Sequence, residues 1–363
     1  MNKKKAIIAM SGGVDSSVAA LLIKERGIDC IGITMQLQGG EDFNIEAEPS
    51  CCTNRDIADA QRVADILGIP FSVLNFSDDF NKQVIERFID AYEKGFTPNP
   101  CIDCNRHIKW AKLFEEMQKL GFDYVVTGHY ARIEYNADTR QYELKKGLDE
   151  TKDQSYVLYN MTQEQLSHTL LPIGELSKPQ VRELAESCGL INAEKPDSQD
   201  ICFIPDGDYA AFIENRTGKT YPKGEFVDKD GNVLGEHKGL IRYTIGQRKG
   251  LGLALKKPGY VCRKCSDTNR VIIGDNEDLF TCRLVADDFN WILGVPEAPI
   301  KVKAKTRYKH REQPATANLL SDGRVEIVFH EPQRAITEGQ AVVLYDGDTV
   351  LGGGTIAETE YNI

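Results

Sequence analysis

A glycine-rich turn between a short apolar run and a helical stripe constrains the fold of this chain more than any other feature. The apolar run Ala6–Met10 leads directly into the sequence Ser-Gly-Gly-Val-Asp-Ser-Ser at residues 11–17. From Ser16 to about Arg26, apolar residues recur at the spacing of one helical face, and a glycine follows. The turn is therefore expected to join a buried strand to a helix.

Strand and helix patterns continue to alternate over the first 200 residues. Further strands are expected at residues 30–37, 71–76 and 124–127, and further helices at 57–67, 84–92 and 108–120. Alternation at these lengths is typical of a parallel sheet with helices on both faces. A polar stretch at residues 39–50 is expected to be a mobile loop.

The pattern changes after about residue 205, where short β-type runs are separated by turn signals. Asp346–Gly347, between two apolar runs, predicts a β-hairpin. The expected fold class is therefore α/β, with an N-terminal parallel-sheet domain at residues 1–205. Two small β-rich, barrel-like domains are expected to follow it, at residues 206–280 and 281–363.

Composition narrows the setting in which the chain works. No apolar run approaches the ~18 residues that span a bilayer, and the glycine-rich turn cuts off the basic lead MNKKKAIIAM before a signal-peptide core is complete. We therefore expect a cytoplasmic protein without a membrane partner. Its ten cysteines are then more often catalytic, metal-bound or buried than disulfide-paired. A net charge of −11 argues against coating by nucleic acid, but it leaves room for a local basic track.

The turn at residues 11–17 has the chemistry of an anion-binding loop. Glycines let backbone N–H groups close on an anion, serine hydroxyls add donors, and the helix N-terminus adds partial positive charge. The alternative is a structural turn in which Asp15 or Ser16 caps the helix. The turn is not a Walker A loop. It resembles the pyrophosphate loop of the ATP pyrophosphatases, which split ATP between its α- and β-phosphates and adenylate a substrate.

Three cysteines stand out at two distant places in the chain. Cys101 and Cys104 lie in TPNPCIDCN, and Cys104 is expected near the N-terminus of the helix at 108–120, where the pKa of a thiol falls. Cys202 lies in DSQDICFI, at another polar-to-apolar turn. Elsewhere, three cysteines offer zinc ligands, but a fourth ligand at a standard spacing is missing: Cys262, Cys265 and Cys282.

These motifs together resemble one family along essentially the whole chain. SGGVDSS, TPNPCIDCN, TGHYAR, KDQSYVLY, DSQDICFI, YTIGQRKGLG and EPQRAITEGQAVVLYDGD occur in the order found in bacterial tRNA-specific 2-thiouridylases. The resemblance implies a tRNA-uridine 2-sulfurtransferase. With ATP it would adenylate the C2 oxygen of the wobble uridine of tRNA, and a cysteine persulfide would replace that oxygen with sulfur. Mg²⁺ is expected to accompany ATP because of its phosphate chemistry. The implied partners are tRNA and a cysteine desulfurase or sulfur-relay protein.

The resemblance also implies roles for individual residues. Cys202 would carry the persulfide, and Cys104 would release the sulfur by forming a disulfide with Cys202. The residues implied to bind ATP are Ala9, Met10, Ser11, Gly12, Gly13, Val14, Asp15, Ser16, Met35 and Gly128. Those implied to contact the target base are Asn99, Pro100 and Cys101, and those implied to contact tRNA are Lys152, Asp153, Gln154, Arg307 and Tyr308. His129 in TGHYAR is either a general base or a structural residue.

Cys101 departs from the family pattern, because many members carry Asp at this position. The change leaves the proton-transfer role of that carboxylate in doubt. It also creates a Cys-x-x-Cys pair that, with Cys202, offers three thiolates to a [4Fe–4S] cluster. Two further functions compete with thiolation, namely a different pyrophosphate-loop synthetase and a non-catalytic RNA-binding adaptor.

A basic track in the last third of the chain is the candidate for tRNA backbone contacts. Six cations alternate in KVKAKTRYKHR, and a regular strand would place them on one face: Lys301, Lys303, Lys305, Arg307, Lys309 and Arg311. The alternative is a solvated edge strand whose lysines prevent aggregation.

Overall fold

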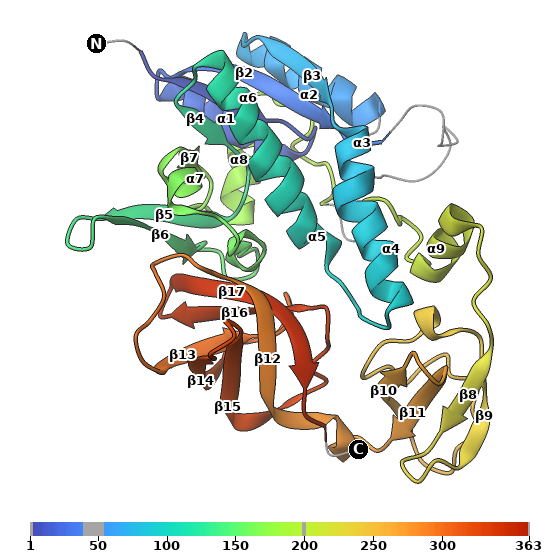
Figure 1. Cartoon of the computed structure of the whole chain (residues 1–363). Coiled ribbons are helices and arrows are strands. Elements are labelled where there is room, and N and C mark those ends of the chain that lie inside the picture. The colour runs from blue at the N-terminus through green and yellow to red at the C-terminus, as the bar shows by residue number, and fades with distance from the viewer. Residues whose placement is uncertain (1–2, 39–53, 198–200, 362–363) are drawn as a thin grey trace. The chain divides into compact units, whose positions relative to one another are not determined.

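The computed structural model describes residues 3–38, 54–197 and 201–361. They form two compact units (Figure 1). The first unit comprises Met1–Glu86, Pro100–Gly207 and Asp348–Leu351, and the second comprises Arg87–Asn99, Asp208–Gly347 and Gly352–Ile363. The expected mobile loop at 39–50 lies outside the described residues. Within these ranges, no helix is long and apolar enough to cross a membrane.

A five-stranded parallel sheet forms the centre of the first unit, as the strand–helix alternation predicted. The strand order is β3-β2-β1-β4-β7, and every neighbouring pair is parallel. The strands are β1 (Lys5–Ala9), β2 (Asp29–Gln36), β3 (Phe71–Asn75), β4 (Tyr124–Val126) and β7 (Thr169–Leu170). The expected strands agree with these bounds within about one residue, because each is a short apolar run.

Helices cover the sheet on both faces. On one face, Ala6 and Ile8 of β1 share a hydrophobic core with α1 (Val14–Glu25), α2 (Asn54–Leu67) and α8 (Lys178–Ser187). Ile7 points to the other face, because side chains alternate along a strand. The helix α6 (Ala111–Leu120) contacts β1 and β4 outside that core. The core therefore fixes the glycine-rich turn between β1 and α1.

Two helical segments begin earlier than the sequence pattern predicted. The helix expected at 84–92 begins at Ser77, and the helix expected at 108–120 begins at Pro100. Proline suits the first turn of a helix, since no intrahelical partner exists there for the N–H that it lacks. The segments run through α3 (Ser77–Phe80), η1 (Asn81–Ile85) and α4 (Glu86–Glu93), and through α5 (Pro100–Asp103), η2 (Cys104–Trp110) and α6. Both η1 and η2 are π-helical, a rare conformation that is frequent at functional sites.

The first unit also contains an antiparallel hairpin that the sequence pattern did not predict. Its strands are β5 (Ala131–Asn136) and β6 (Gln141–Lys146). Asn136 at the end of β5 accepts hydrogen bonds from the backbone N–H groups of Asp138 and Thr139 and so builds the turn. The remaining short elements of the unit are η3 (Ser155–Leu158) and α7 (Gln163–Ser167).

The second unit contains a four-stranded sheet and a closed barrel. The sheet has the order β10-β11-β8-β9, and Phe226, Tyr243 and Val261 lie in its core. In the barrel, six strands follow in the order β12-β15-β14-β13-β16-β17, and pairing of β12 with β17 closes the ring. The bounds are β8 (Gly224–Val227), β9 (Val233–His237), β10 (Tyr260–Cys265), β11 (Arg270–Gly274), β12 (Phe280–Trp291), β13 (Ile300–Lys305), β14 (Gln313–Leu319), β15 (Val325–Arg334), β16 (Ala341–Asp346) and β17 (Thr349–Thr359).

This unit confirms the expected β-rich, barrel-like fold in its main features. The predicted hairpin at Asp346–Gly347 joins β16 to β17. One helix was not expected in this region, α9 (Tyr209–Thr217), and it begins where the Asp208 side chain accepts a hydrogen bond from the Ala211 N–H. Short 3₁₀ turns lie at η4 (Leu240–Arg242) and η5 (Glu277–Leu279). The division into three domains at residues 205 and 280 stays a prediction.

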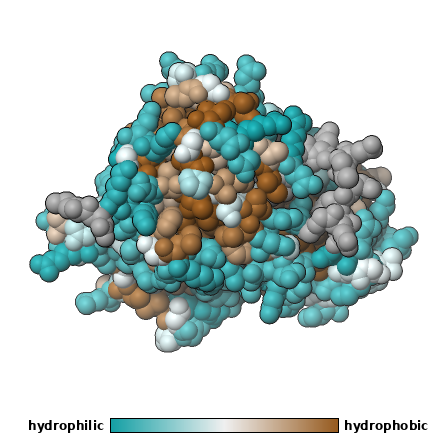
Figure 2. All heavy atoms as spheres, turned by 90° about the horizontal axis from the view of Figure 1, so that it is seen from above, coloured by the Kyte–Doolittle hydropathy of each residue, from teal (hydrophilic) through white to brown (hydrophobic). Residues whose placement is uncertain are grey.

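Hydrophobic residues also reach the surface of the protein. They gather in the middle of the face seen in Figure 2, where hydrophilic residues surround them. Ile66 on α2 and Val73 on the edge strand β3 are among the exposed large hydrophobic residues of the first unit.

Candidate active site

The turn between β1 and α1 contains one glycine, Gly12, that no other residue can replace. Gly12 has a positive φ of 73°, and a Cβ atom there would lie 2.4 Å from the carbonyl oxygen of Asp56. Gly13 is the N-cap of α1, which begins at Val14, and no side chain of the described residues caps this helix. The alternative of a turn capped by Asp15 or Ser16 is therefore wrong, because both residues already lie within the first helical turn.

Side chains of the protein donate hydrogen bonds to the backbone carbonyl groups of the turn. The hydroxyls of Ser16 and Ser17 each donate to the Gly13 carbonyl at 3.0 Å. Asn192 Nδ2 donates to the Gly12 carbonyl at 3.0 Å, and Lys195 Nζ donates to the same carbonyl at 3.2 Å. The backbone N–H groups in the first turn of a helix lack intrahelical partners. In α1, these N–H groups are therefore the donors available to an anion.

The remaining residues implied to bind ATP lie around this turn. Ala9 ends β1 and Met35 lies one residue before the end of β2, so both lie at the carboxyl edge of the sheet. Gly128 follows β4, and a Cβ atom on it would lie 2.6 Å from the carbonyl carbon of Asp15 and 2.6 Å from the nitrogen of Ser16. The structure therefore brings these distant positions together with the turn.

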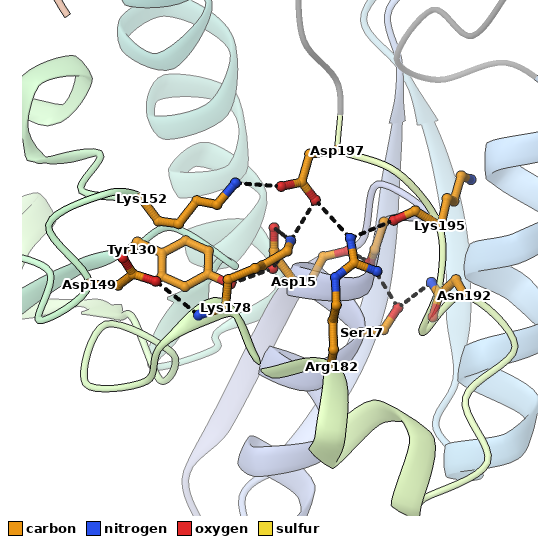
Figure 3. Close-up of polar contacts among 12 residues, drawn as sticks. Asp15, Ser17, Tyr130, Asp149, Lys152, Lys178, Arg182, Asn192, Lys195 and Asp197 are labelled. Atoms are coloured by element: carbon orange, nitrogen blue, oxygen red, sulfur yellow. Dashed lines mark hydrogen bonds and ion pairs between the residues drawn. The ribbon is translucent and has the colours of Figure 1, made fainter. Parts of the chain in front are cut away.

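Asp15 is the centre of a polar network beside the turn (Figure 3). Its Oδ1 accepts a hydrogen bond of 2.7 Å from the hydroxyl of Tyr130. Lys178 Nζ lies 2.8 Å from Oδ1 and 2.9 Å from Oδ2 of Asp15, and 2.6 Å from Oδ1 of Asp197. Burial, followed by the neighbouring Asp15 carboxylate, raises the pKa of Tyr130, so its hydroxyl keeps the proton that it donates.

Asp197 links this network to the motif that carries Cys202. Besides Lys178, it contacts Lys152 Nζ at 2.8 Å and Arg182 Nη2 at 3.6 Å (Figure 3). Burial by itself would raise the pKa of Asp197, but the hydrogen bonds from Lys152 and Lys178 outweigh it and lower the pKa. Asp197 is therefore ionised at neutral pH.

A second ion-pair group also braces the turn. Lys195 Nζ lies 2.7 Å from Asp56 and 2.8 Å from Asp59, both on α2, while it donates to the Gly12 carbonyl. Burial by itself would lower the pKa of Lys195, but the two carboxylates outweigh it and raise the pKa. The ammonium is therefore charged at neutral pH, and α2 is anchored to the turn.

The two proposed catalytic cysteines lie in the same unit. Cys104 is buried at the start of η2, and Cys202 is half-buried. The ring of Phe203, beside Cys202, lies 5.8 Å from that of Phe80 on α3, and α3 contacts η2. The residue beside Cys202 therefore packs against α3, and α3 contacts the helical segment that begins with Cys104.

The position of Cys104 in its helix differs from the prediction. Because the helix begins at Pro100, Cys104 lies one turn inside it, and the exposed Cys101 occupies the first turn instead. The positive end of the helix therefore lies nearer to Cys101. Pro100 is buried and Asn99 is half-buried.

In the part of the chain that the structure describes, the donor groups for a metal centre are not assembled. Among the described residues, no three side chains of His, Cys, Asp or Glu lie together as a set that could hold a metal ion. Cys101, Cys104 and Cys202 therefore do not form a ready [4Fe–4S] site, and Cys262, Cys265 and Cys282 do not form a zinc site. Burial raises the pKa of Cys262 to about 11, which keeps this thiol protonated.

His129 is built into the protein interior. It is buried, its Nδ1 lies 2.7 Å from the Thr127 hydroxyl, and its ring centroid lies 6.0 Å from that of Trp110. Burial, followed by the charge of Lys109, lowers the pKa of His129 well below its usual value. The imidazole is therefore neutral, and its surroundings favour a structural role over that of a general base.

The segment Lys152–Gln154 has structural contacts for each of its residues. Lys152 bonds Asp197, and Asp153 accepts hydrogen bonds from the backbone of Gly147 and Ser155. Gln154 Oε1 accepts a hydrogen bond from the Tyr130 N–H. These contacts orient the loop, and the tRNA contacts of the segment stay a prediction.

The basic track is shorter than the sequence predicted. The strand β13 ends at Lys305, so one face carries only Lys301, Lys303 and Lys305. Arg307 turns inward, and its Nη2 donates to the Thr337 hydroxyl at 2.5 Å and the Ala335 carbonyl at 3.0 Å. The six-residue stripe is therefore wrong, because the chain turns after β13. The edge-strand alternative is wrong as well, since β13 pairs with β14 and β16.

For Arg307 and Tyr308, a tRNA contact stays a prediction. The Nζ of Lys305 lies 5.6 Å from the centroid of the Tyr308 ring.

Sequence reasoning missed several residues of the network around the turn. It assigned no role to Tyr130, Lys178, Asn192, Lys195 or Asp197. Tyr130 lies in the motif TGHYAR and Asp197 in the motif DSQDICFI, so the sequence pattern could have indicated both residues. Lys178 had none, because it meets Asp15 across 163 positions of the chain.

Three family models match the chain. A tRNA methyl transferase HUP domain matches residues 4–206, a tRNA methyl transferase PRC-barrel domain matches residues 210–275, and an aminomethyltransferase beta-barrel domain matches residues 281–356.

Curated relatives match the chain over nearly its full length. The tRNA-specific 2-thiouridylase MnmA of Clostridioides difficile is 51% identical over 98% of this chain and 99% of its own. Its namesake from Acetivibrio thermocellus is 51% identical over 98% of this chain and 100% of its own. Among solved structures, a 4-thiouridine synthetase bound to RNA and ATP has a TM-score of only 0.37 at 16% identity, over 59% of this chain and 50% of that chain. The identity to the curated relatives shows that this chain belongs to the tRNA-specific 2-thiouridylase family.

Proposed function

We propose that this protein catalyses the 2-thiolation of the wobble uridine of tRNA. ATP adenylates the C2 oxygen of the base, and sulfur from a cysteine persulfide then replaces it. The observation that carries this proposal is the braced glycine turn at the carboxyl edge of the sheet, in one unit with Cys104 and Cys202. The curated relatives, named as tRNA-specific 2-thiouridylases, support the choice of acceptor.

The nucleotide step falls to the turn and to α1. Their N–H groups and the positive end of the helix hold the phosphates of ATP, while Gly128 lets the adjoining loop approach the backbone of Asp15. Mg²⁺ accompanies ATP as its phosphate-bound counterion. Adenylation matters because a carbonyl oxygen is a poor leaving group, whereas AMP is a good one.

The sulfur step falls to the two cysteines. The terminal sulfur of the Cys202 persulfide attacks C2 of the adenylated base, the C2–O bond breaks, and AMP leaves. The Cys104 thiolate then attacks Sγ of Cys202, the persulfide S–S bond breaks, and the sulfur stays on the uridine. A Cys104–Cys202 disulfide results, and an external thiol must reduce it with two electrons before the next cycle.

The alternative of a [4Fe–4S] cluster has no assembled donor set in the described residues. The proposed mechanism therefore contains no step through a cluster. Iron and acid-labile sulfide in anaerobically purified protein would revive it.

The proposal also names the partners of the enzyme and the compartment in which it acts. Its nucleic-acid partner is tRNA. A cysteine desulfurase or sulfur-relay protein loads Cys202, and the reaction takes place in the cytoplasm.

The test is a coupled assay of pyrophosphate release and thiouridine formation. We expect Cys202→Ser to abolish thiolation while tRNA binding and pyrophosphate release persist. Cys188→Ser, which changes an exposed cysteine at the end of α8, is the matched control and is expected to be fully active. Normal thiolation by Cys202→Ser would overturn the cysteine assignment. Pyrophosphate release without tRNA would favour a different synthetase, and tRNA binding without any release would favour an adaptor.

A further inference from the structure

We propose that Lys178 and Asp197 are positioning residues that tie the Cys202 segment to the phosphate-binding turn. This inference rests on the proposed function and deepens it. The bridge Asp15–Lys178–Asp197 joins a residue of the turn to the start of the motif that carries the persulfide cysteine (Figure 3). It would hold the sulfur donor at the nucleotide site.

The ammonium of Lys178 is committed to this bridge. Lys178 is only 7% exposed. Its Nζ makes three contacts of 2.6–2.9 Å to Asp15 and Asp197, which match the three donors of an ammonium group. The ring of Tyr130 lies 5.9 Å from Nζ and covers it further. Charge-assisted bonds shielded from water in this way are stronger and better defined than exposed ion pairs.

The base of the Lys178 side chain is fixed as well. Lys178 is the first residue of α8, where Ser177 and Gln180 form a capping box. Its backbone N–H donates to Asp149 Oδ2 at 3.0 Å, which anchors the helix start to the loop before η3. The ammonium therefore cannot follow one carboxylate away from the other without breaking a contact.

Chain length carries this restraint from Asp197 to Cys202. The two residues are five positions apart, and five extended residues span at most about 18 Å. Residues 198–200 lie outside the described part of the chain, so chain length alone limits how far the Cys202 backbone moves from the fixed Asp197. Loss of the bridge would leave the turn intact but let the sulfur donor leave the adenylated base. Misplacement of a reacting group by about 1 Å can cost on the order of 100-fold in rate.

The test compares two products of one reaction mixture. In Asp197→Asn, we expect tRNA-dependent pyrophosphate release within about twofold of the parent enzyme and thiouridine formation reduced about tenfold or more. The ratio of pyrophosphate released to thiouridine formed would rise, a change that mere destabilisation does not produce. Lys178→Met should raise the same ratio, and Lys178→Arg, which keeps a charged donor, should restore part of the coupling.

Asp123→Asn is the matched control. Asp123 also binds a lysine, Lys4 at 2.6 Å, but it lies at the amino edge of the sheet beside the start of β1. Its ratio of products should equal that of the parent enzyme. A parallel fall of both products in Asp197→Asn, or an unchanged ratio, would overturn the inference. Failure of the parent enzyme to release pyrophosphate with tRNA would instead contradict the proposed function.

Discussion

At the scale of single residues, the site depends on positions where a side chain is forbidden. Gly12 approaches the backbone of Asp56, and Gly128 approaches the backbone of Asp15 and Ser16. Close backbone approach of this kind needs glycine whatever the local secondary structure. The order of the motifs indicated these glycines, but the partners that they approach are set by the tertiary fold.

We expect Gly128→Ala to impair the nucleotide step. The added methyl group would lie 2.6 Å from two backbone atoms of the first turn of α1, so the turn must shift. Overpacking of this kind costs about 1–3 kcal/mol, which is roughly 5- to 150-fold in ATP affinity if the turn bears it all. Titration of ATP in the pyrophosphate-release assay measures the loss. Gly27→Ala meets no atom within 4 Å and carries only backbone strain, so it should keep the parent KM for ATP.

Because of Lys264, the stability of the second unit is expected to depend on pH. Its Nζ lies 5.9 Å from the centroid of Tyr92 and 3.4 Å from the Phe96 carbonyl, and burial lowers the pKa of Lys264 to about 8 although Glu338 opposes the shift. A lowered lysine pKa means that the charged form destabilises the folded state below pH 8. This cost fades as the pH rises from about 8 to the unfolded value of about 10.4.

Lys264→Met should therefore raise the free energy of unfolding at pH 7 by roughly 1–3 kcal/mol. The gain should shrink as the pH rises toward 10. Chemical denaturation of both proteins at several pH values measures it. A gain that stays constant with pH would show that packing, and not the charge of Lys264, sets the difference.

At the scale of secondary structure elements, the sequence located strands better than helix starts. The strands of the parallel sheet are short apolar runs with clear ends, so their bounds came out within about one residue. The helices beginning at Ser77 and Pro100 start with polar or proline-rich turns that lack the apolar repeat. The hairpin β5–β6 was missed because each of its strands has only one buried residue, Ala131 in β5 and Leu144 in β6, so neither shows a run of buried apolar residues.

The elements also explain how much of the site could be predicted. The glycine turn, Met35 and Gly128 all follow strands of one parallel sheet, and the carboxyl ends of such strands meet at one edge. Lys178, Asn192 and Lys195 come from α8 and the segment after it, and nothing in the spacing pairs them with the turn. Tertiary packing of α8 on α1 brings them there.

At the scale of the whole molecule, the proposed function requires a chain of net charge −11 to bind an anionic tRNA. A local field can do this where cations gather away from the acidic surface. The exposed Lys301 and Lys303 share one face of β13. This strand is paired on both sides, with β14 and β16, in the wall of the closed barrel, so its register is fixed. Two fixed cations on a rigid strand suit contact with two backbone phosphates.

Reversal of both charges in Lys301→Glu/Lys303→Glu should therefore weaken tRNA binding and flatten its salt dependence. Each phosphate that the protein no longer neutralises reduces the steepness of log K against log salt by roughly 0.7–0.9, so a change of up to about 2 is expected. Lys223→Glu/Lys257→Glu changes the net charge equally at exposed lysines paired with Glu236 and Asp275, and it should leave that slope nearly unchanged. If both double variants weaken binding alike, only the net charge matters and β13 is not in the interface.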